Sequence, residues 1–259
     1  MKSFPPERIV CLTEETVETL YLLSEDARIV GVSGYCVRPP HVRREKPRVS
    51  AFTSADIPKI LDLRPDIVLS FSDLQAEIVA ALLREGVTVM AYNQRDVAGI
   101  LAMIRHLGAM VGAADKAEAL AAGYEARLKA MADAHEGPRP RVYFEEWDEP
   151  LISGIGWVSE LIHVAGGQDV FAGHAEAGKA KDRILMPEQV ITAKPDIILA
   201  SWCGKKVRPE KIAARPGWAE IPAVRDGRII EIKSPLILQP GPAALTEGLD
   251  AIAAAIQPV

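Results

Sequence analysis

Residues 61–71 read LDLRPDIVLSF, and residues 191–201 repeat the pattern as ITAKPDIILAS. In each copy a helix-forming run meets a basic residue and Pro-Asp, and a short apolar run follows. Because proline breaks a helix and an apolar run without alternation is typical of a strand buried on both faces, each copy predicts a helix followed by a strand of a parallel sheet. Two such copies predict two similar α/β lobes, and a cleft between two lobes is a common place for a small ligand.

The segment between the two copies predicts how the lobes are connected. Residues 115–136 are rich in Ala, Glu, Lys, Arg and Leu and contain no proline, and Gly137-Pro138 follows. This composition predicts one long helix that ends at residue 137. The expected fold is therefore α/β, with two Rossmann-like lobes that contain parallel sheets and are joined by one long rigid helix. The predicted domains are an N-terminal lobe over residues 1–113, a connecting helix over 114–137 and a C-terminal lobe over 138–259.

Composition narrows the possible partners and the compartment. The 259 residues carry a formal net charge of −5 and no long Lys/Arg run, so nothing favours binding to a nucleic acid. No apolar run reaches the length of a transmembrane helix, and residues 1–8 contain no apolar leader. The three cysteines show no paired spacing, which fits reduced thiols. The sequence as written predicts a cytoplasmic protein without membrane insertion, or a periplasmic one if a signal peptide has been removed.

The candidate binding residues come from the loops that follow predicted strands. In a parallel sheet these loops lie at the carboxyl edge, where ligands bind. Aromatic residues gather in these loops although they make up only 5% of the chain, and aromatic rings suit a flat conjugated ligand. The alternative for Trp147 and Trp202 is that they are core residues at the edge of the second sheet, and the alternative for the acidic run 145–149 is that it is a solvated rim. The predicted ligand-binding residues are Tyr35, Arg38, Phe52, Phe71, Glu146, Trp147 and Trp202.

Metal binding and catalysis have less support in the sequence. Cys36 and Cys203 fall in corresponding loops of the two predicted lobes, where they could hold a metal ion near Glu146 or His41. No CxxC or HxxxH spacing accompanies them, so free thiols are the simpler interpretation. No GxSxG, GxGxxG or GK[ST] motif is present. The sequence predicts a binding protein that requires no cofactor, with no catalytic residues.

The order of several motifs resembles that of a known family. Val30–Tyr35, Arg64-Pro65-Asp66, the central helix, Val164–Gly167 and Lys194-Pro195-Asp196 follow one another through most of the chain. This order is similar to that of the class III (helical-backbone) solute-binding proteins of ABC importers, and in particular of their vitamin B12-binding members. The resemblance implies that the ligand is cobalamin or another metal chelate, such as a corrinoid, haem or a ferric siderophore. It also implies a possible partner, an ABC permease.

The aromatic positions match the B12-binding members only in the first lobe. Tyr35, Phe52 and Phe71 stand where those members place aromatic rings against the corrin. In the second lobe, Asp182 and Ile152 replace aromatic residues. The resemblance therefore implies a related ligand whose contacts with the second lobe differ.

Other departures concern the contact with the permease. Family members dock through one Glu on each lobe, and Glu188 matches the second of these whereas Pro58 stands at the first. The family's disulfide positions fall at Ala165 and about Ile252, so that disulfide is absent. These departures imply a cytoplasmic, non-enzymatic binder of a cobalamin-like chelate that has left transport. The alternatives are the substrate-binding subunit of an ABC importer for such a chelate and a metal- or corrinoid-handling enzyme.

Overall fold

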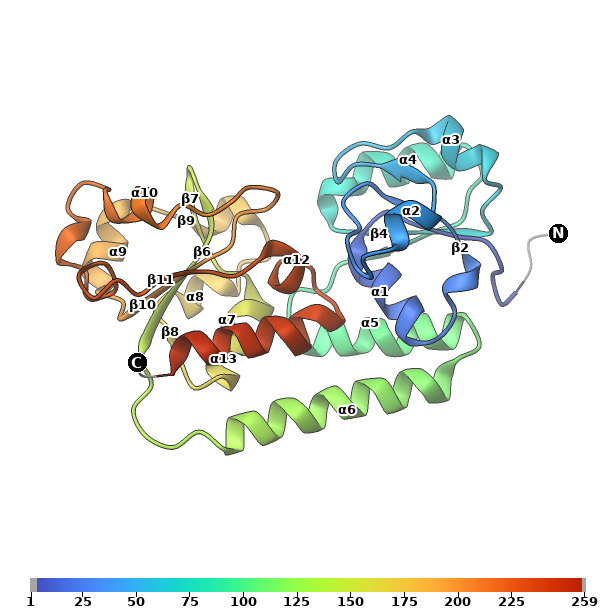
Figure 1. The fold of residues 1–259 in the computed structure, drawn as a ribbon. Coiled ribbons are helices and arrows are strands. Elements are labelled where there is room, and N and C mark those ends of the chain that lie inside the picture. The colour runs from blue at the N-terminus through green and yellow to red at the C-terminus, as the bar shows by residue number, and fades with distance from the viewer. Residues whose placement is uncertain (1–3, 258–259) are drawn as a thin grey trace. The chain divides into compact units, whose positions relative to one another are not determined.

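The computed structural model describes residues 4–257, which form two compact units (Figure 1). Unit 1 contains the chain up to residue 94 and residues 98–123, and unit 2 contains residues 95–97 and the chain from residue 124. The outer ends of the predicted domains, residues 1–3 and 258–259, lie outside the described residues. The predicted boundaries after residues 113 and 137 stay a prediction.

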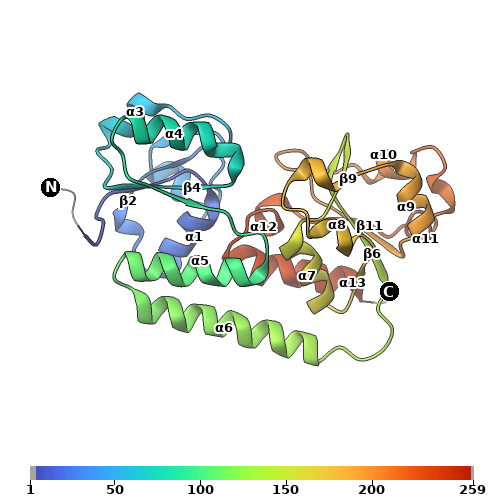
Figure 2. The same ribbon diagram turned by 180° about the vertical axis from the view of Figure 1, so that it is seen from behind.

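Unit 1 is built on a five-stranded sheet in the order β3-β2-β1-β4-β5, and all its neighbouring strands are parallel. Helices α3 and α4 lie on one face of this sheet, and α1 and α5 lie on the other (Figures 1 and 2). Because both faces are covered, strand residues such as Val10 and Leu69 are fully buried. The strands are β1 (Ile9–Cys11), β2 (Ile29–Ser33), β3 (Arg48–Ser50), β4 (Ile67–Phe71) and β5 (Val89–Tyr92).

The helices of unit 1 connect these strands in the alternation that the sequence predicts. They are α1 (Glu14–Leu22), η1 (Asp26–Arg28), α2 (Val42–Glu45), α3 (Ile57–Asp62), η2 (Asp73–Gln75), α4 (Ala76–Arg84) and α5 (Val97–Met110). The predicted connecting helix is α6 (Ala114–Asp133), whose 20 residues span about 30 Å. A Cβ atom on Gly108 of α5 would lie 2.1 Å from the Cβ of Ala117 of α6, so only glycine permits this close contact.

Unit 2 contains a six-stranded sheet that is mixed and not purely parallel. Strands β10, β11 and β8 belong to its parallel part, whereas β7 runs antiparallel to both β6 and β9. The expected second lobe is therefore confirmed as α/β, but its sheet departs from the parallel prediction at the β7 and β9 end. The strands are β6 (Arg141–Asp148), β7 (Leu151–Ser153), β8 (Gln168–Asp169), β9 (Ile184–Leu185), β10 (Ile197–Ala200) and β11 (Ile229–Glu231).

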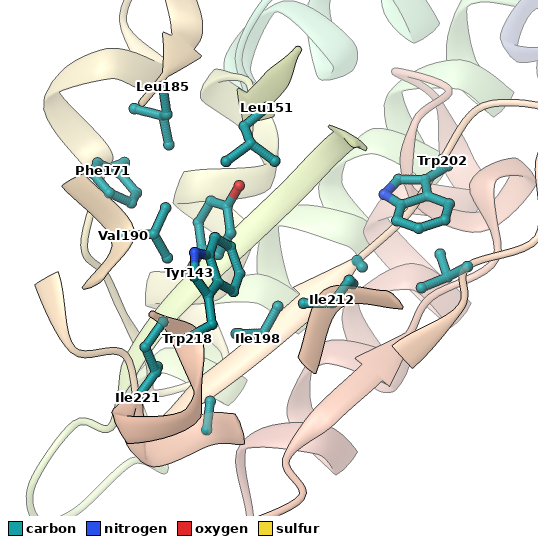
Figure 3. Packing of buried hydrophobic residues seen from close by; sticks show 13 residues of the cluster. Tyr143, Leu151, Phe171, Leu185, Val190, Ile198, Trp202, Ile212, Trp218 and Ile221 are labelled. Atoms are coloured by element: carbon teal, nitrogen blue, oxygen red, sulfur yellow. The ribbon is translucent and has the colours of Figure 1, made fainter. Parts of the chain in front are cut away.

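A cluster of buried side chains that includes Tyr143, Phe171 and Trp218 packs against this sheet. Tyr143 of β6 and Trp218 meet edge to face with their ring centroids 6.4 Å apart, and Phe171 meets Tyr143 in the same geometry at 5.5 Å (Figure 3). The helical elements of unit 2 are α7 (Gly156–Val164), α8 (Ala172–Ala175), η3 (Ala180–Arg183), α9 (Pro187–Ala193), α10 (Pro209–Ala213), η4 (Trp218–Glu220), α11 (Pro222–Arg225), α12 (Ser234–Ile237), η5 (Ala244–Gly248) and α13 (Leu249–Ile256).

The repeated sequence phrase forms the same local structure in both units. Asp66 accepts hydrogen bonds at 2.9 Å from the backbone N–H groups of Glu7 and Arg8, and the Arg8 guanidinium donates to the carbonyl oxygen of Leu63. In unit 2, Asp196 accepts from the N–H of Arg141 at 2.8 Å, and the Arg141 guanidinium donates to the carbonyl oxygen of Ala193. The phrase therefore fastens the end of a helix to the start of the central strand in each unit.

The residue before each Pro-Asp pair supplies the turn. Arg64 and Lys194 have φ angles of 47° and 45°, in the left-handed region that non-glycine residues adopt only occasionally.

Across residues 4–257 no helix combines the length and the apolar character needed to cross a membrane.

Candidate functional site

The carboxyl edge of the sheet in unit 1 collects the aromatic residues predicted from the sequence. Phe71 ends β4 and is 5% exposed, Phe52 is half-buried after β3, and Tyr35 is 55% exposed after β2. Arg38 is half-buried in the same loop as Tyr35, and its Nε donates to Glu18 at 2.9 Å. Unit 1 therefore brings these four residues to one edge, with Tyr35 the most accessible ring.

A buried amide that the sequence reasoning missed joins two of the aromatic loops. The Gln75 side chain is fully buried; its Nε2 donates to the carbonyl oxygen of Phe52 at 2.8 Å, and its Oε1 accepts from the N–H of Phe71 at 3.2 Å. The Nε2 also lies 3.5 Å from the carbonyl oxygen of Leu12, which follows β1. Gln75 thus fixes the backbones of three strand ends. The only sign of this role in the sequence is that a polar residue, Gln75, stands at the start of a predicted amphipathic helix.

Two acidic side chains at the same edge are buried at the start of α1. Glu14 is 5% exposed and Glu15 is 1% exposed, and the Oε2 atom of each has no hydrogen-bond partner among the described residues. Burial, with the negative charges of Glu15 and Glu18, raises the pKa of Glu14 to about 8. Burial raises the pKa of Glu15 to about 7, although the Thr13 hydroxyl donates a hydrogen bond to it. The edge is therefore less negative at neutral pH than its composition indicates.

The cysteines differ in their surroundings. Cys36 is fully buried, and burial together with the Glu14 charge raises the pKa of its thiol, which disfavours the thiolate that binds metals. Burial likewise raises the pKa of Cys11 to about 12. Cys203 is exposed in unit 2. Among the described residues no group of three or more His, Cys, Asp or Glu side chains is arranged to hold a metal ion.

In unit 2 the acidic residues at the carboxyl end of β6 are paired with cations. Glu145 is fully buried and accepts two hydrogen bonds from the Arg215 guanidinium, at 2.5 and 2.9 Å. Glu146 accepts two from Arg183, at 2.7 and 2.9 Å, and Arg183 is itself 1% exposed. These carboxylates are therefore parts of internal ion pairs and do not form a solvated rim. The role of Glu146 as a ligand-binding residue stays a prediction.

The rings of Trp147, which lies within this run, and of Trp202 both contact Lys205. Trp202 is 1% exposed and its Nε1 donates to Glu145 at 3.2 Å, whereas Trp147 is only partly buried. The Lys205 ammonium lies 5.1 Å from the Trp147 ring centroid and 4.9 Å from that of Trp202, and it forms an ion pair with Asp148 at 2.6 Å. Trp202 thus lies in the core of unit 2, which was the alternative to ligand contact (Figure 3). Contact of the Trp147 or Trp202 ring with a ligand stays a prediction.

Two hollows mark the surface of unit 2. The larger, of about 520 Å³, is lined by Arg141, Glu188 and Thr192 and lies at the amino end of β6, away from the strand-end loops. The smaller, of about 290 Å³, lies at the carboxyl ends of β10 and β11, beside Trp202 and Lys205. We take the smaller as the candidate ligand site, because ligands of parallel sheets bind at carboxyl ends.

The residues aligned with the family's docking acids lie on comparable helices. Glu188 is exposed on the first turn of α9, and Pro58 lies in the first turn of α3. Asp56, which could replace the missing acid, caps α3 by accepting a hydrogen bond from the N–H of Lys59 at 3.1 Å. Each of these helices ends within a copy of the repeated phrase.

Comparison with known proteins connects this architecture to a family. The sequence profile described as periplasmic binding protein matches residues 9–236. The vitamin B12-binding protein of Vibrio cholerae is 27% identical, over 94% of this chain and 87% of that protein. An uncharacterized ABC transporter substrate-binding lipoprotein of Bacillus subtilis, YvrC, is 25% identical over 98% of this chain and 81% of its own length. Among solved structures, the periplasmic haem-binding protein RhuT from Roseiflexus sp. RS-1 has a TM-score of 0.79 at 27% identity, with 97% of this chain and 99% of that chain covered.

Proposed function

The chain belongs to the periplasmic binding protein family, and we propose that it is the substrate-binding subunit of an ABC importer that captures a metal chelate. The chelates considered are cobalamin or another corrinoid, haem, and a ferric siderophore. The observation that carries the proposal is the similarity, over nearly the whole chain, to proteins named for binding vitamin B12 and haem. The family is one of binding proteins, so the chain is not an enzyme and the metal- or corrinoid-handling enzyme is set aside.

The comparisons favour the importer subunit over a binder that has left transport. One relative is named as a substrate-binding lipoprotein of an ABC transporter, and another as a periplasmic protein. We therefore propose an extracytoplasmic location and an ABC permease as the partner. In this proposal Glu188 contacts the permease and another side chain near Pro58 provides the second contact.

The side chains at the carboxyl edge of unit 1 support a flat chelate as the ligand. Tyr35 is largely exposed and Phe52 is half-buried, so both rings can add contact area to a conjugated ligand without leaving the core empty. Arg38, held by Glu18, offers a charge beside them. We propose Tyr35, Phe52 and Arg38 as the ligand contacts of unit 1, with Phe71 behind them because it is 5% exposed.

The test is direct retention of a coloured ligand. Purified protein is incubated with cyanocobalamin, haem or a ferric siderophore, desalted, and examined for visible absorbance. We expect one chelate to be retained, and we expect Phe52→Ala to weaken its binding by about 1 to 3 kcal/mol.

Phe4→Ala is the matched control for this substitution, because Phe4 is 83% exposed and precedes the amino end of β1 in the chain. Retention of none of the chelates contradicts the proposal. Equal losses of affinity in the two variants place Phe52 outside the ligand contacts.

A further inference from the structure

A basic lining distinguishes the smaller hollow of unit 2. Its wall contains the three lysines 205, 206 and 233, together with Trp202 and the one carboxylate of Glu231. The lysines come from two separate segments that follow β10 and β11, so the fold and not a local run of sequence brings them together. The lining therefore carries an excess of positive charge at the edge where a ligand is expected.

The three lysines differ in how their charges are balanced. Lys205 pairs with Asp148 at 2.6 Å, and Lys233 pairs with Glu231 at 2.6 Å. Lys206 forms no hydrogen bond or ion pair with any described residue, although its charge helps to lower the pKa of Glu231 against the opposing effect of burial. Two acids therefore face three ammonium groups, and Lys206 has its donors available.

The ammonium group of Lys205 already has several neighbours within unit 2. Its ammonium lies over the rings of Trp147 and Trp202, and its ion-pair partner Asp148 is 14% exposed. Lys206, which is exposed and unpaired among the described residues, and Lys233, which is 62% exposed against 44% for Lys205, are then better placed to receive an incoming anion.

We propose that the ligand is a metal chelate with free carboxylate groups and that Lys206 and Lys233 bind one of these carboxylates beside Trp202. This inference rests on the proposed function and narrows its substrate class. Haem, through its propionates, and a ferric carboxylate complex share this chemistry, whereas cobalamin presents amide side chains. A charged rim of this kind contributes to selection and to the rate of capture more than to total affinity.

The experiment compares charged and neutral forms of the same chelate. The affinities of the wild-type protein for haem, haem dimethyl ester, ferric citrate and cyanocobalamin are measured by titration in one buffer with the same dilute detergent. We expect haem or ferric citrate to bind, haem to bind more tightly than its ester, and the Lys206→Gln/Lys233→Gln protein to bind the charged chelate about fivefold more weakly. Any affinity for the ester should not change in this double variant.

The control variant is Lys129→Gln, which removes a 75% exposed lysine from α6 and leaves the hollow intact. A preference for cyanocobalamin or for the ester overturns the inference and leaves the proposed function standing. The same holds if the double variant behaves like the control or loses affinity for charged and neutral chelates alike. If the protein binds none of the four probes and does not bind a neutral siderophore either, both the inference and the proposed function are overturned.

Discussion

Replacing Gln75 by leucine should loosen the ligand-facing edge of unit 1. The substitution keeps a side chain of similar size but removes the bonds to the carbonyl oxygen of Phe52 and the N–H of Phe71, at 2.8 and 3.2 Å. Gln75 is fully buried, so water does not replace these partners. Leaving a buried donor or acceptor unsatisfied costs about 1 to 3 kcal/mol, and two such groups give a loss of about 2 to 6 kcal/mol for unit 1.

Hydrogen exchange at the Phe71 amide measures this loss where it arises. Mass spectrometry of a peptide that covers β4 should show faster exchange in Gln75→Leu, by a factor of about 30 or more if the opening free energy falls by 2 kcal/mol. The four tryptophans all lie in unit 2, so tryptophan fluorescence during urea unfolding reports on that unit separately.

Gln168→Leu is the matched control, because Gln168 is exposed and its side chain forms no bond to the rest of the described chain. Exchange in β4 should be unchanged in this control. If Gln75→Leu exchanges at the wild-type rate, Gln75 does not hold the loops together and the assignment of Phe52 to the binding edge loses its structural basis.

Three further predictions follow from the buried charges and rings. Glu145→Ala should destabilise unit 2 by about 3 to 5 kcal/mol, because it leaves Arg215 with its charge unpaired, whereas Glu145→Gln with Arg215→Met should cost less; urea unfolding followed by tryptophan fluorescence measures both. Because the pKa of Glu14 rises from 4.5 to about 8 in the folded protein, the folded state binds more protons and stability should fall as pH rises from about 4.5 to 8; Glu14→Gln should flatten this fall, whereas the exposed Glu7→Gln should not. Trp202→Ala should reduce stability by about 3 to 5 kcal/mol, and an unchanged melting temperature would contradict its place in the core.

The repeated phrase explains why the sequence predicts so much of the fold. Its proline breaks the helix and its basic residue adopts the left-handed turn, and both are local effects. Its aspartate binds the start of a strand that lies 58 positions earlier in unit 1 and 55 earlier in unit 2, but the repetition of the phrase makes this contact recognisable. The parallel strand that follows each Pro-Asp pair is a short apolar run, which can be recognised in the sequence. Strands β7 and β9 escape detection because they contain three and two residues and pair antiparallel beside a turn.

The candidate site was less predictable because its contacts join distant parts of the chain. Glu146 and Arg183 are 37 positions apart, Asp148 and Lys205 are 57 apart, and Glu145 and Arg215 are 70 apart. No periodicity of the sequence indicates such pairs, so the sequence alone gives no reason to expect that these carboxylates are paired. The sequence places aromatic rings at strand ends correctly but cannot tell a ring that faces solvent, such as Tyr35, from one in the core, such as Trp202.

This pairing changes what unit 2 can offer a ligand. With Glu145, Glu146 and Asp148 each paired with a cation, most of the negative charge of the acidic run is balanced before any ligand arrives. Among the charged residues that line the smaller hollow, Lys206 is the one without an ion-pair partner in the described chain. The lining of this hollow therefore carries more positive charge than the neighbouring acidic run indicates, and for this reason we propose a carboxylate-bearing chelate, and not a bare metal ion, as the ligand.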